Sequence, residues 1–254
     1  MTHPVFGRLY ENRVVVMTGA GSGIGRSTLL AFHAAGARII AHLGRHETRH
    51  SGLPEDVQVL TGDFTRPEDQ QQFIAEVRAR THKVDVLINN AGTMFGRFPA
   101  DSLTEEQYQS IVELNQHAVV RITRGLLPLL KVAGQSASKA AIVNTVSISA
   151  STGGSPGSSI YSASKAFVSA YSRGLARELA ADGIRVNAVS PGVIDTDFHA
   201  RYSSAEKLET TRRQIPLQRL GTSEDCAPAF LFLAAEQLSA YITGQVLEIN
   251  GGQR

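Results

Sequence analysis

Tyr161 and Lys165 are four residues apart, and their types and spacing suggest proton chemistry. Residues four apart on a helix share one face, so both side chains would point into the same space. A free tyrosine titrates at about pH 10. A nearby ammonium stabilises the phenolate and lowers the tyrosine pKa. Such a tyrosine can donate a proton to a substrate oxygen, or accept one from it, near neutral pH.

A glycine-rich turn, Thr18 to Gly25, follows one short apolar run and precedes a stretch that favours a helix. Glycines in this position let the backbone approach a pyrophosphate closely, and the N-terminus of a helix favours its negative charge. Glycine spacing by itself also occurs in plain tight turns. The strand before the turn and the helix after it are what favour dinucleotide binding.

Short Val- and Ile-rich runs alternate with amphipathic stretches along the whole chain, without a change in composition that would mark a linker. Such runs are typical of parallel strands that helices cover on both faces. We therefore expect a single domain, residues 1–254, with a Rossmann-type, doubly wound α/β fold and a seven-stranded parallel sheet. The predicted strands are 13–18, 38–43, 57–60, 84–89, 141–147, 184–189 and 246–249. The predicted helices are 27–35, 67–81, 104–131, 160–181 and 224–236.

The polar stretch 193–216 lies between the sixth strand and the last helix and holds three arginines. Ligands of this fold bind outside the carboxyl ends of the strands. We therefore expect this stretch to be an insertion that covers the substrate.

Composition excludes several other classes of protein. The 25 basic and 23 acidic residues give a net charge of +2, too small to indicate a nucleic-acid partner. No apolar run approaches the length of a membrane span, and residues 1–10 lack the apolar core of a signal peptide. The single cysteine, Cys226, excludes an internal disulfide and is expected to be inert. We expect a cytoplasmic protein without a membrane partner.

Three histidines spaced by four, His42, His46 and His50, resemble a ligand set for a metal ion. A predicted strand end and Gly44 interrupt them, so no helix would hold them on one face beside a carboxylate. We expect no metal site.

Six motifs occur in one order along the chain and together resemble the short-chain dehydrogenase/reductase family. They are Thr18-Gly19-x3-Gly23-x-Gly25, Asn89-Asn90-Ala91-Gly92, Tyr161-x3-Lys165, Pro191-Gly192-Val193-Ile194-Asp195-Thr196, Tyr241-Ile242-Thr243-Gly244-Gln245 and Asn250-Gly251-Gly252. The tail resembles that of 3-oxoacyl-carrier-protein reductases, although many activities share it. The resemblance implies an NAD(P)-dependent oxidoreductase that acts on a carbonyl or secondary alcohol.

The resemblance also implies a catalytic group of four residues. Tyr161 would exchange the proton, and Lys165 would tune Tyr161 and bind the nicotinamide ribose. Ser147 would stabilise the substrate oxygen, with Ser149 as the alternative in the same serine-rich stretch. Asn115 would hold a water in a proton relay with Lys165, although a buried polar residue that only kinks the helix is the other interpretation.

The cofactor is expected to be NADP(H), with NAD(H) possible. An acid at the end of the second strand would bind the ribose of NAD, whereas a base would pair with the extra phosphate of NADP. The chain reads His42-Leu43-Gly44-Arg45 there, which makes Arg45 the candidate partner of that phosphate and Ser22 its helper. The connection from Gly44 to Asp56 is shorter than relatives usually have, and Arg45 could also be a solvated loop residue.

Asp63 and Phe64 match the family residues beside the adenine, and Asn90, Ala91 and Gly92 those beside the adenosine ribose. The full expected cofactor-binding set is Gly19, Gly21, Ser22, Gly23, Ile24, Gly25, Arg45, Asp63, Phe64, Asn90, Ala91, Gly92, Tyr161, Lys165, Pro191, Gly192, Ile194 and Thr196.

Two alternatives to a carbonyl oxidoreductase remain open. A non-catalytic nucleotide-binding regulatory protein could use the same fold, and epimerase or dehydratase chemistry could use a retained cofactor. The family resemblance also implies a homo-oligomer, a tetramer formed through the helices predicted at 104–131 and 160–181.

Overall fold

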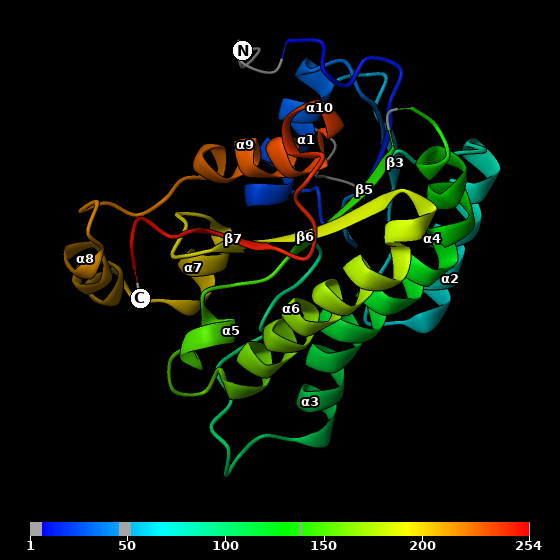
Figure 1. Cartoon of the computed structure of the whole chain (residues 1–254). Coiled ribbons are helices and arrows are strands. Elements are labelled where there is room, and N and C mark those ends of the chain that lie inside the picture. Colours follow the sequence, from blue (N-terminus) through cyan, green and yellow to red (C-terminus); the bar gives the residue numbers. More distant parts are fainter. Residues whose placement is uncertain (1–6, 46–51, 138, 254) are drawn as a thin grey trace.

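Seven strands form one parallel sheet in the part of the chain that the computed structural model describes, residues 7–45, 52–137 and 139–253 (Figure 1). Their order across the sheet is β3-β2-β1-β4-β5-β6-β7. The order reverses between β1 and β4, so a crevice opens at the carboxyl ends of these two strands. The predicted doubly wound fold is confirmed. The strands are β1 (Val14–Thr18), β2 (Arg38–His42), β3 (Gln58–Leu60), β4 (Val86–Asn89), β5 (Ala140–Thr145), β6 (Ile184–Pro191) and β7 (Val246–Ile249).

Helices cover both faces of the sheet, which explains why the central strands are apolar along their whole length. Every residue of β1, β4, β5 and β6 is buried. One hydrophobic core lies under α1 (Gly23–Ala34) and α9 (Ser223–Ala234), which α10 (Glu236–Ser239) follows. The other lies under α2 (Pro67–Arg80), α4 (Ala118–Gly134) and α6 (Ser159–Leu179). Figure 1 shows the two groups of helices on opposite sides of the strands.

The helix predicted at 104–131 is interrupted, which corrects the expected boundaries. The chain forms α3 (Glu105–Val112), a five-residue π-helical turn (Glu113–His117) and then α4. The predicted capping box of Thr104 and Gln107 is present at the start of α3. The Asn115 side chain donates a hydrogen bond to Ile111 O at 2.8 Å, within the widened turn. Hydrophobic periodicity cannot reveal such a turn, because one extra residue barely changes the pattern.

Two further boundaries differ from prediction in ways that matter for the site. The helix predicted at 27–35 begins at Gly23, so the glycine turn itself forms its first turn. The strand predicted at 141–147 ends at Thr145, and a short helix, α5 (Ser149–Thr152), follows. Ser147 therefore lies in the turn between strand and helix and not at the strand end.

The segment 193–216 forms two helices, α7 (Asp197–Tyr202) and α8 (Ala205–Gln214). Figure 1 shows both at the carboxyl-end side of the sheet, beside α5 and beyond β6 and β7. The segment 193–216 thus lies where ligands of this fold bind.

A one-turn 3₁₀ helix (Ala180–Asp182) connects α6 to β6.

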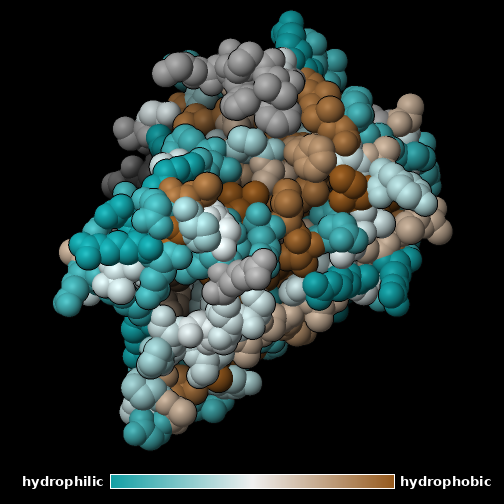
Figure 2. Space-filling view, turned by 60° about the vertical axis from the view of Figure 1, so that its left-hand side comes forward, coloured by the Kyte–Doolittle hydropathy of each residue, from teal (hydrophilic) through white to brown (hydrophobic). Residues whose placement is uncertain are grey.

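Among the described residues, no helix is both long enough and apolar enough to cross a bilayer. Figure 2 shows hydrophobic residues around the middle and upper part of one face, with hydrophilic residues around them. The exposed hydrophobic side chains include Phe167, which stacks on Tyr171. They also include Tyr241, whose ring is fully exposed.

Asp85 fastens the start of β4 to the start of β1. Its fully buried carboxylate accepts a hydrogen bond from Val14 N at 2.7 Å. The same carboxylate forms ion pairs with Arg13 Nε and with Lys83 Nζ, each at 3.2 Å. Removal of one partner from a buried ionic group leaves the other charge without compensation.

We expect Asp85→Ala to lower the free energy of unfolding by about 3–5 kcal/mol, measured by urea unfolding. Glu76→Ala is the matched control, because Glu76 pairs with Arg80 on the surface of α2 at 3.0 Å. Its loss should cost less than about 1 kcal/mol. Equal effects of the two substitutions would contradict a structural role for the buried carboxylate.

Candidate active site

A cavity of about 660 Å³ runs along the carboxyl ends of the strands, from the glycine turn after β1 to the helices α7 and α8. Its walls come from the turns that follow β1, β2, β3, β4, β5 and β6, together with α6 and the 193–216 segment. Most of the residues expected to bind cofactor or substrate therefore meet in one space, although they are far apart in the sequence.

The glycine turn offers an unsatisfied helix N-terminus to this cavity. Ser22 precedes α1, makes no side-chain capping bond, and no acidic residue lies in the first turn. A Cβ at Gly25 would lie 2.1 Å from Gly19 O, so a side chain cannot be placed there. Gly19 has a φ of +66°, which glycine adopts readily. These features fit the close approach of a pyrophosphate to free backbone N–H groups.

Asn90 and Thr18 join the glycine turn to the ends of β4 and β5. The Asn90 side chain donates to Gly19 O at 2.9 Å and accepts from Thr145 Oγ1 at 3.1 Å. The Thr18 hydroxyl accepts from the backbone N–H groups of Asn90 and Ala91 at 3.0 and 3.1 Å. The Asn90 amide therefore holds the cavity wall together, besides lining it.

At the end of β2, Arg45 lies 3.3 Å from the Asp63 carboxylate. The other Asp63 oxygen accepts hydrogen bonds from Thr65 N and Oγ1. Burial alone would raise the pKa of Asp63, but the Thr65 hydrogen bonds and the charge of Arg45 lower it below its usual value. Asp63 is thus a carboxylate that the protein already neutralises.

The ring of Phe64 lies flat against His42, with centroids 3.7 Å apart. Phe64 is buried, and only a small part of it reaches the cavity that was expected to hold the adenine. The Nε2–H group of His42 donates to Gly62 O at 3.0 Å. His46 and His50, the other members of the histidine series, lie outside the described residues.

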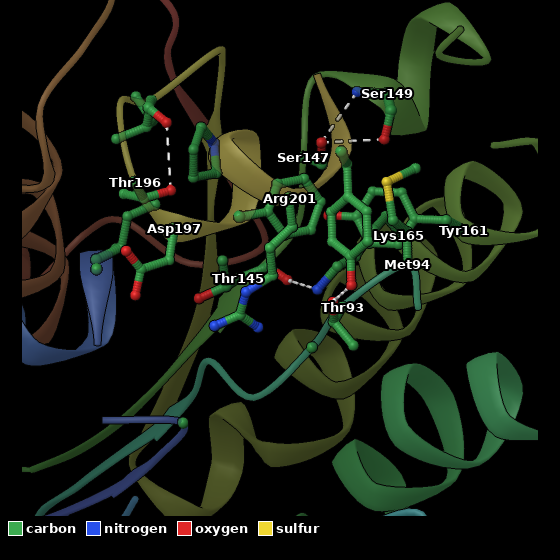
Figure 3. Close-up of a pocket in the computed structure, with 18 of the residues that line it drawn as sticks. Thr93, Met94, Thr145, Ser147, Ser149, Tyr161, Lys165, Thr196, Asp197 and Arg201 are labelled. Atoms are coloured by element: carbon green, nitrogen blue, oxygen red, sulfur yellow. Dashed lines mark hydrogen bonds between the residues drawn. The ribbon is translucent and has the colours of Figure 1, made fainter. Parts of the chain in front are cut away.

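Tyr161, near the start of α6, faces Ser147 across the cavity. Burial raises the pKa of Tyr161 to about 12, and a hydrogen bond with Ser147 partly offsets this rise. The Ser147 oxygen accepts two hydrogen bonds from Ser149, one from the hydroxyl at 3.0 Å and one from the backbone N–H at 3.2 Å (Figure 3). With both acceptor positions used, the Ser147 hydroxyl proton is left to donate.

Lys165 follows Tyr161 by one helical turn and is buried. Its ammonium donates to Thr145 O at 2.9 Å and lies 5.9 Å from the centre of the Tyr161 ring. Burial lowers the pKa of Lys165 to about 8. Desolvation is the largest influence on the pKa of Tyr161 and raises it, and the group that lowers it is Ser147, not Lys165. The expected tuning of Tyr161 by Lys165 therefore stays a prediction.

Asn115 lies behind the cavity wall and is completely buried. Its amide nitrogen donates to Thr93 O and Ile111 O, each at 2.8 Å. Its Oδ1 atom has no hydrogen-bond partner among the described residues. A Cβ on Gly92 would lie 2.7 Å from Asn115 Oδ1 and 2.9 Å from Lys165 Nζ, so only a glycine there leaves both groups close together.

The cavity includes all the expected site residues except two. Gly21 is buried inside the glycine turn, and Asn115 reaches the cavity only through its neighbours. Pro191, Gly192, Ile194 and Thr196 line the wall after β6. Thr196 packs against Gly23, where a Cβ would lie 3.2 Å from its methyl group.

Some lining residues were not expected from the sequence, among them Thr93 and Arg97 in the turn after β4. Thr93 Oγ1 lies 3.1 Å from the Tyr202 hydroxyl, and Arg97 Nε donates to Tyr202 O at 3.0 Å. Their position after a strand was the available signal, because turns at the carboxyl ends of parallel strands form the binding crevice.

Cys226 is buried in α9, away from the cavity lining. Burial, with the nearby Asp225 and Glu224 carboxylates, raises the pKa of its thiol to about 12. The thiol is therefore protonated and packs as a small apolar side chain.

Comparison with known proteins agrees with this geometry. A family model described as enoyl-(acyl carrier protein) reductase matches residues 19–254. The 3-oxoacyl-[acyl-carrier-protein] reductase of Thermotoga maritima is 35% identical over 249 residues, which are 95% of this chain and 98% of that protein. The 3alpha-hydroxysteroid dehydrogenase of Mediterraneibacter gnavus is 34% identical, over 97% of this chain and 98% of its own.

Among solved structures, the 3-ketoacyl-(acyl-carrier-protein) reductase of Brucella melitensis complexed with NADH has a TM-score of 0.85 and 30% identity. The match covers 95% of this chain and 98% of that one. With the fold, the glycine turn and the Tyr161–Lys165 pair, these matches show that the chain belongs to the short-chain dehydrogenase/reductase family of nicotinamide-dependent oxidoreductases.

Proposed function

We propose that the protein interconverts a carbonyl compound and a secondary alcohol by a Ser-Tyr-Lys-Asn mechanism. The observation that carries the proposal is the meeting of Ser147, Tyr161 and Lys165 in the cavity that begins at the glycine turn. The unsatisfied N-terminus of α1 fits the pyrophosphate of a nicotinamide nucleotide. When bound, that nucleotide would supply the hydride in reduction or accept it in oxidation.

In the reductive direction, the substrate carbon gains the hydride and Tyr161 gives its phenolic proton to the substrate oxygen, which yields the alcohol. Ser147 donates a hydrogen bond to the same oxygen, because Ser149 already occupies its acceptor positions. A donor fixed in this way stabilises the charge that develops on the oxygen without reorganising. We therefore assign the catalytic serine to Ser147 and a positioning role to Ser149.

Lys165 and Asn115 would restore the proton that Tyr161 gives away. The Lys165 ammonium is held by Thr145 O and lies on the same side of α6 as Tyr161. The buried Oδ1 atom of Asn115, without a partner in the described chain, is an acceptor that an ordered water can satisfy. Such a water would connect Lys165 to the interior of the π-helical turn.

We further propose NADP(H) as the preferred cofactor. No acid stands at the end of β2, and Asp63, the nearest carboxylate at that end of the cavity, is already paired with Arg45. The Arg45 guanidinium is 62% exposed, so it can turn to a phosphate. The related Brucella melitensis structure holds NADH, which makes NAD(H) the alternative that a binding experiment must decide.

A homotetramer in the cytoplasm is part of the same proposal. Phe167 on α6 and Val132 on α4 are 40% and 50% exposed, which is unusual for large apolar side chains and consistent with contact between subunits. The segment 193–216 is proposed to cover the substrate, since α7 and α8 line the cavity.

Tyr161→Phe should retain cofactor binding and reduce turnover by about a thousandfold or more, because it removes the transferable proton and leaves the ring. Cofactor binding is measured by fluorescence titration, and turnover by the change in nicotinamide absorbance with a panel of ketones. Tyr108→Phe on α3 is the control and should behave like the wild type. If wild type shows no absorbance change while binding cofactor tightly, the protein is a non-catalytic nucleotide binder.

The raised pKa of Tyr161 predicts opposite pH profiles for the two directions. At neutral pH the phenol is protonated, so reduction should change little between pH 6 and about 8. Oxidation needs the phenolate, whose fraction increases by up to tenfold per pH unit below the pKa. Alcohol oxidation should therefore rise from pH 7 to about 10, measured as kcat/KM with either cofactor. An oxidation rate that falls over this range would rule out Tyr161 as the base.

Titration with NADPH and NADH should show tighter binding of NADPH. Arg45→Gln should weaken NADPH binding by about tenfold or more and leave NADH binding unchanged, since a guanidinium–phosphate pair is lost. Arg66→Gln is the control, because Arg66 is exposed and does not line the cavity. Tighter binding of NADH by the wild type would overturn the assignment of Arg45.

A further inference from the structure

The cavity wall that faces away from the glycine turn carries a concentration of positive charge. Arg97 in the turn after β4, Arg201 on α7 and Lys207 on α8 line the same space as Tyr161. Figure 3 shows the Arg201 side chain extending from its helix into the pocket. None of these three residues takes part in the proposed transfer of hydride and proton.

Two of the three cations are held in place by neutral groups. Arg97 donates through Nε to Tyr202 O at 3.0 Å and through Nη1 to Pro156 O at 3.3 Å. Lys207 Nζ donates to Ser155 Oγ at 3.0 Å. These contacts position the charges without neutralising them, and they leave donor hydrogens on both groups.

Arg201 is exposed and makes no hydrogen bond or ion pair with any side chain that the structure describes. Other arginines of the same segment are engaged, since Arg212 and Arg213 both pair with Glu209 on α8. A guanidinium that reaches into a cavity and pairs with no protein group can form an ion pair with a negatively charged group of the ligand.

Negative charge on this wall is scarce. The acidic side chain on this wall is that of Asp197, at the start of α7. It forms no ion pair within the described chain. Asp63 lies at the other end of the cavity, beside Arg45. Burial and the positive charge of Arg97 lower the pKa of Lys207, so the two cations lie close enough to repel each other.

We propose that the substrate is an oxo acid, which places its carbonyl at Tyr161 and a carboxylate among Arg97, Arg201 and Lys207. This inference rests on the proposed oxidoreductase function and specifies its substrate class. A carboxylate matches the planar guanidinium groups and would offset the repulsion between the cations. The site would thereby discriminate against the uncharged ester of the same compound.

Apolar side chains between the two ends would hold the carbon chain of the oxo acid. Phe198 lies between Tyr161 and Tyr202, with ring centroids 5.9 Å from the first and 5.0 Å from the second. Leu208 and Met94 also line this part of the cavity. We therefore expect several carbons between the reacting carbonyl and the carboxylate of the substrate, and the probes must vary that length.

The test compares 4-oxopentanoate and 5-oxohexanoate with their methyl esters as substrates of the full chain. We expect kcat/KM for at least one acid to exceed that of its ester by about tenfold or more. Arg201→Gln and Lys207→Gln should each reduce this ratio several-fold. Arg213→Gln is the matched control on α8 and should leave the ratio unchanged, because Arg213 pairs with Glu209 outside the cavity. Salt at about 0.5 M should also reduce the ratio.

Calorimetric binding of the same acids and esters, with and without the cofactor, separates this inference from the proposed function. Acid binding that weakens in Arg201→Gln supports the inference even if no compound is reduced, and then the oxidoreductase proposal alone fails. Esters, or a neutral N-acetylcysteamine thioester of a 3-oxo acid, that bind and react as well as the acids would overturn it. Preference for dihydroxyacetone phosphate over every oxo acid would also overturn it, in favour of a phosphate.

Discussion

The hydrogen bonds around Asn90 are the constraint on which the rest of the site depends. They connect Gly19 after β1, the turn after β4 and Thr145 at the end of β5. The carbonyl of Thr145 in turn accepts a hydrogen bond from the Lys165 ammonium. A partly buried amide with paired groups on both sides is costly to displace, because each lost bond would leave a polar group without a partner. The glycine turn and the Tyr161–Lys165 pair are therefore held in one rigid frame.

The chemistry of the site follows from burial as much as from residue type. Desolvation raises the pKa of Tyr161 and lowers that of Lys165, so burial favours the neutral forms of both. In this state Tyr161 is an acid with its proton in place. In the proposed mechanism, the low dielectric around this buried pair would also strengthen the hydrogen bond that Ser147 would donate to a substrate oxygen.

The two ends of the cavity present positive charge through different groups. The glycine turn presents backbone N–H groups at a helix N-terminus, which suit a pyrophosphate whatever the side chains. The opposite wall presents charged side chains from α7, α8 and the turn after β4. Under the proposed function, the fold would keep its cofactor chemistry while the wall beyond Tyr161 would select the substrate.

The sequence by itself determined the sheet, its seven strands and the positions of Tyr161, Lys165 and the glycine turn, because these depend on local periodicity and spacing. It did not determine the π-helical turn at Asn115, the start of α1 at Gly23 or the end of β5 before Ser147. The π-helical turn and the end of β5 involve hydrogen bonds between different segments, from Asn115 to Thr93 O and from Val146 N to Val189 O. The protonation of Tyr161, the pairing of Arg45 with Asp63 and the meeting of Arg97 with Lys207 were likewise decided only by the tertiary structure, since burial and through-space charge have no signature in local sequence.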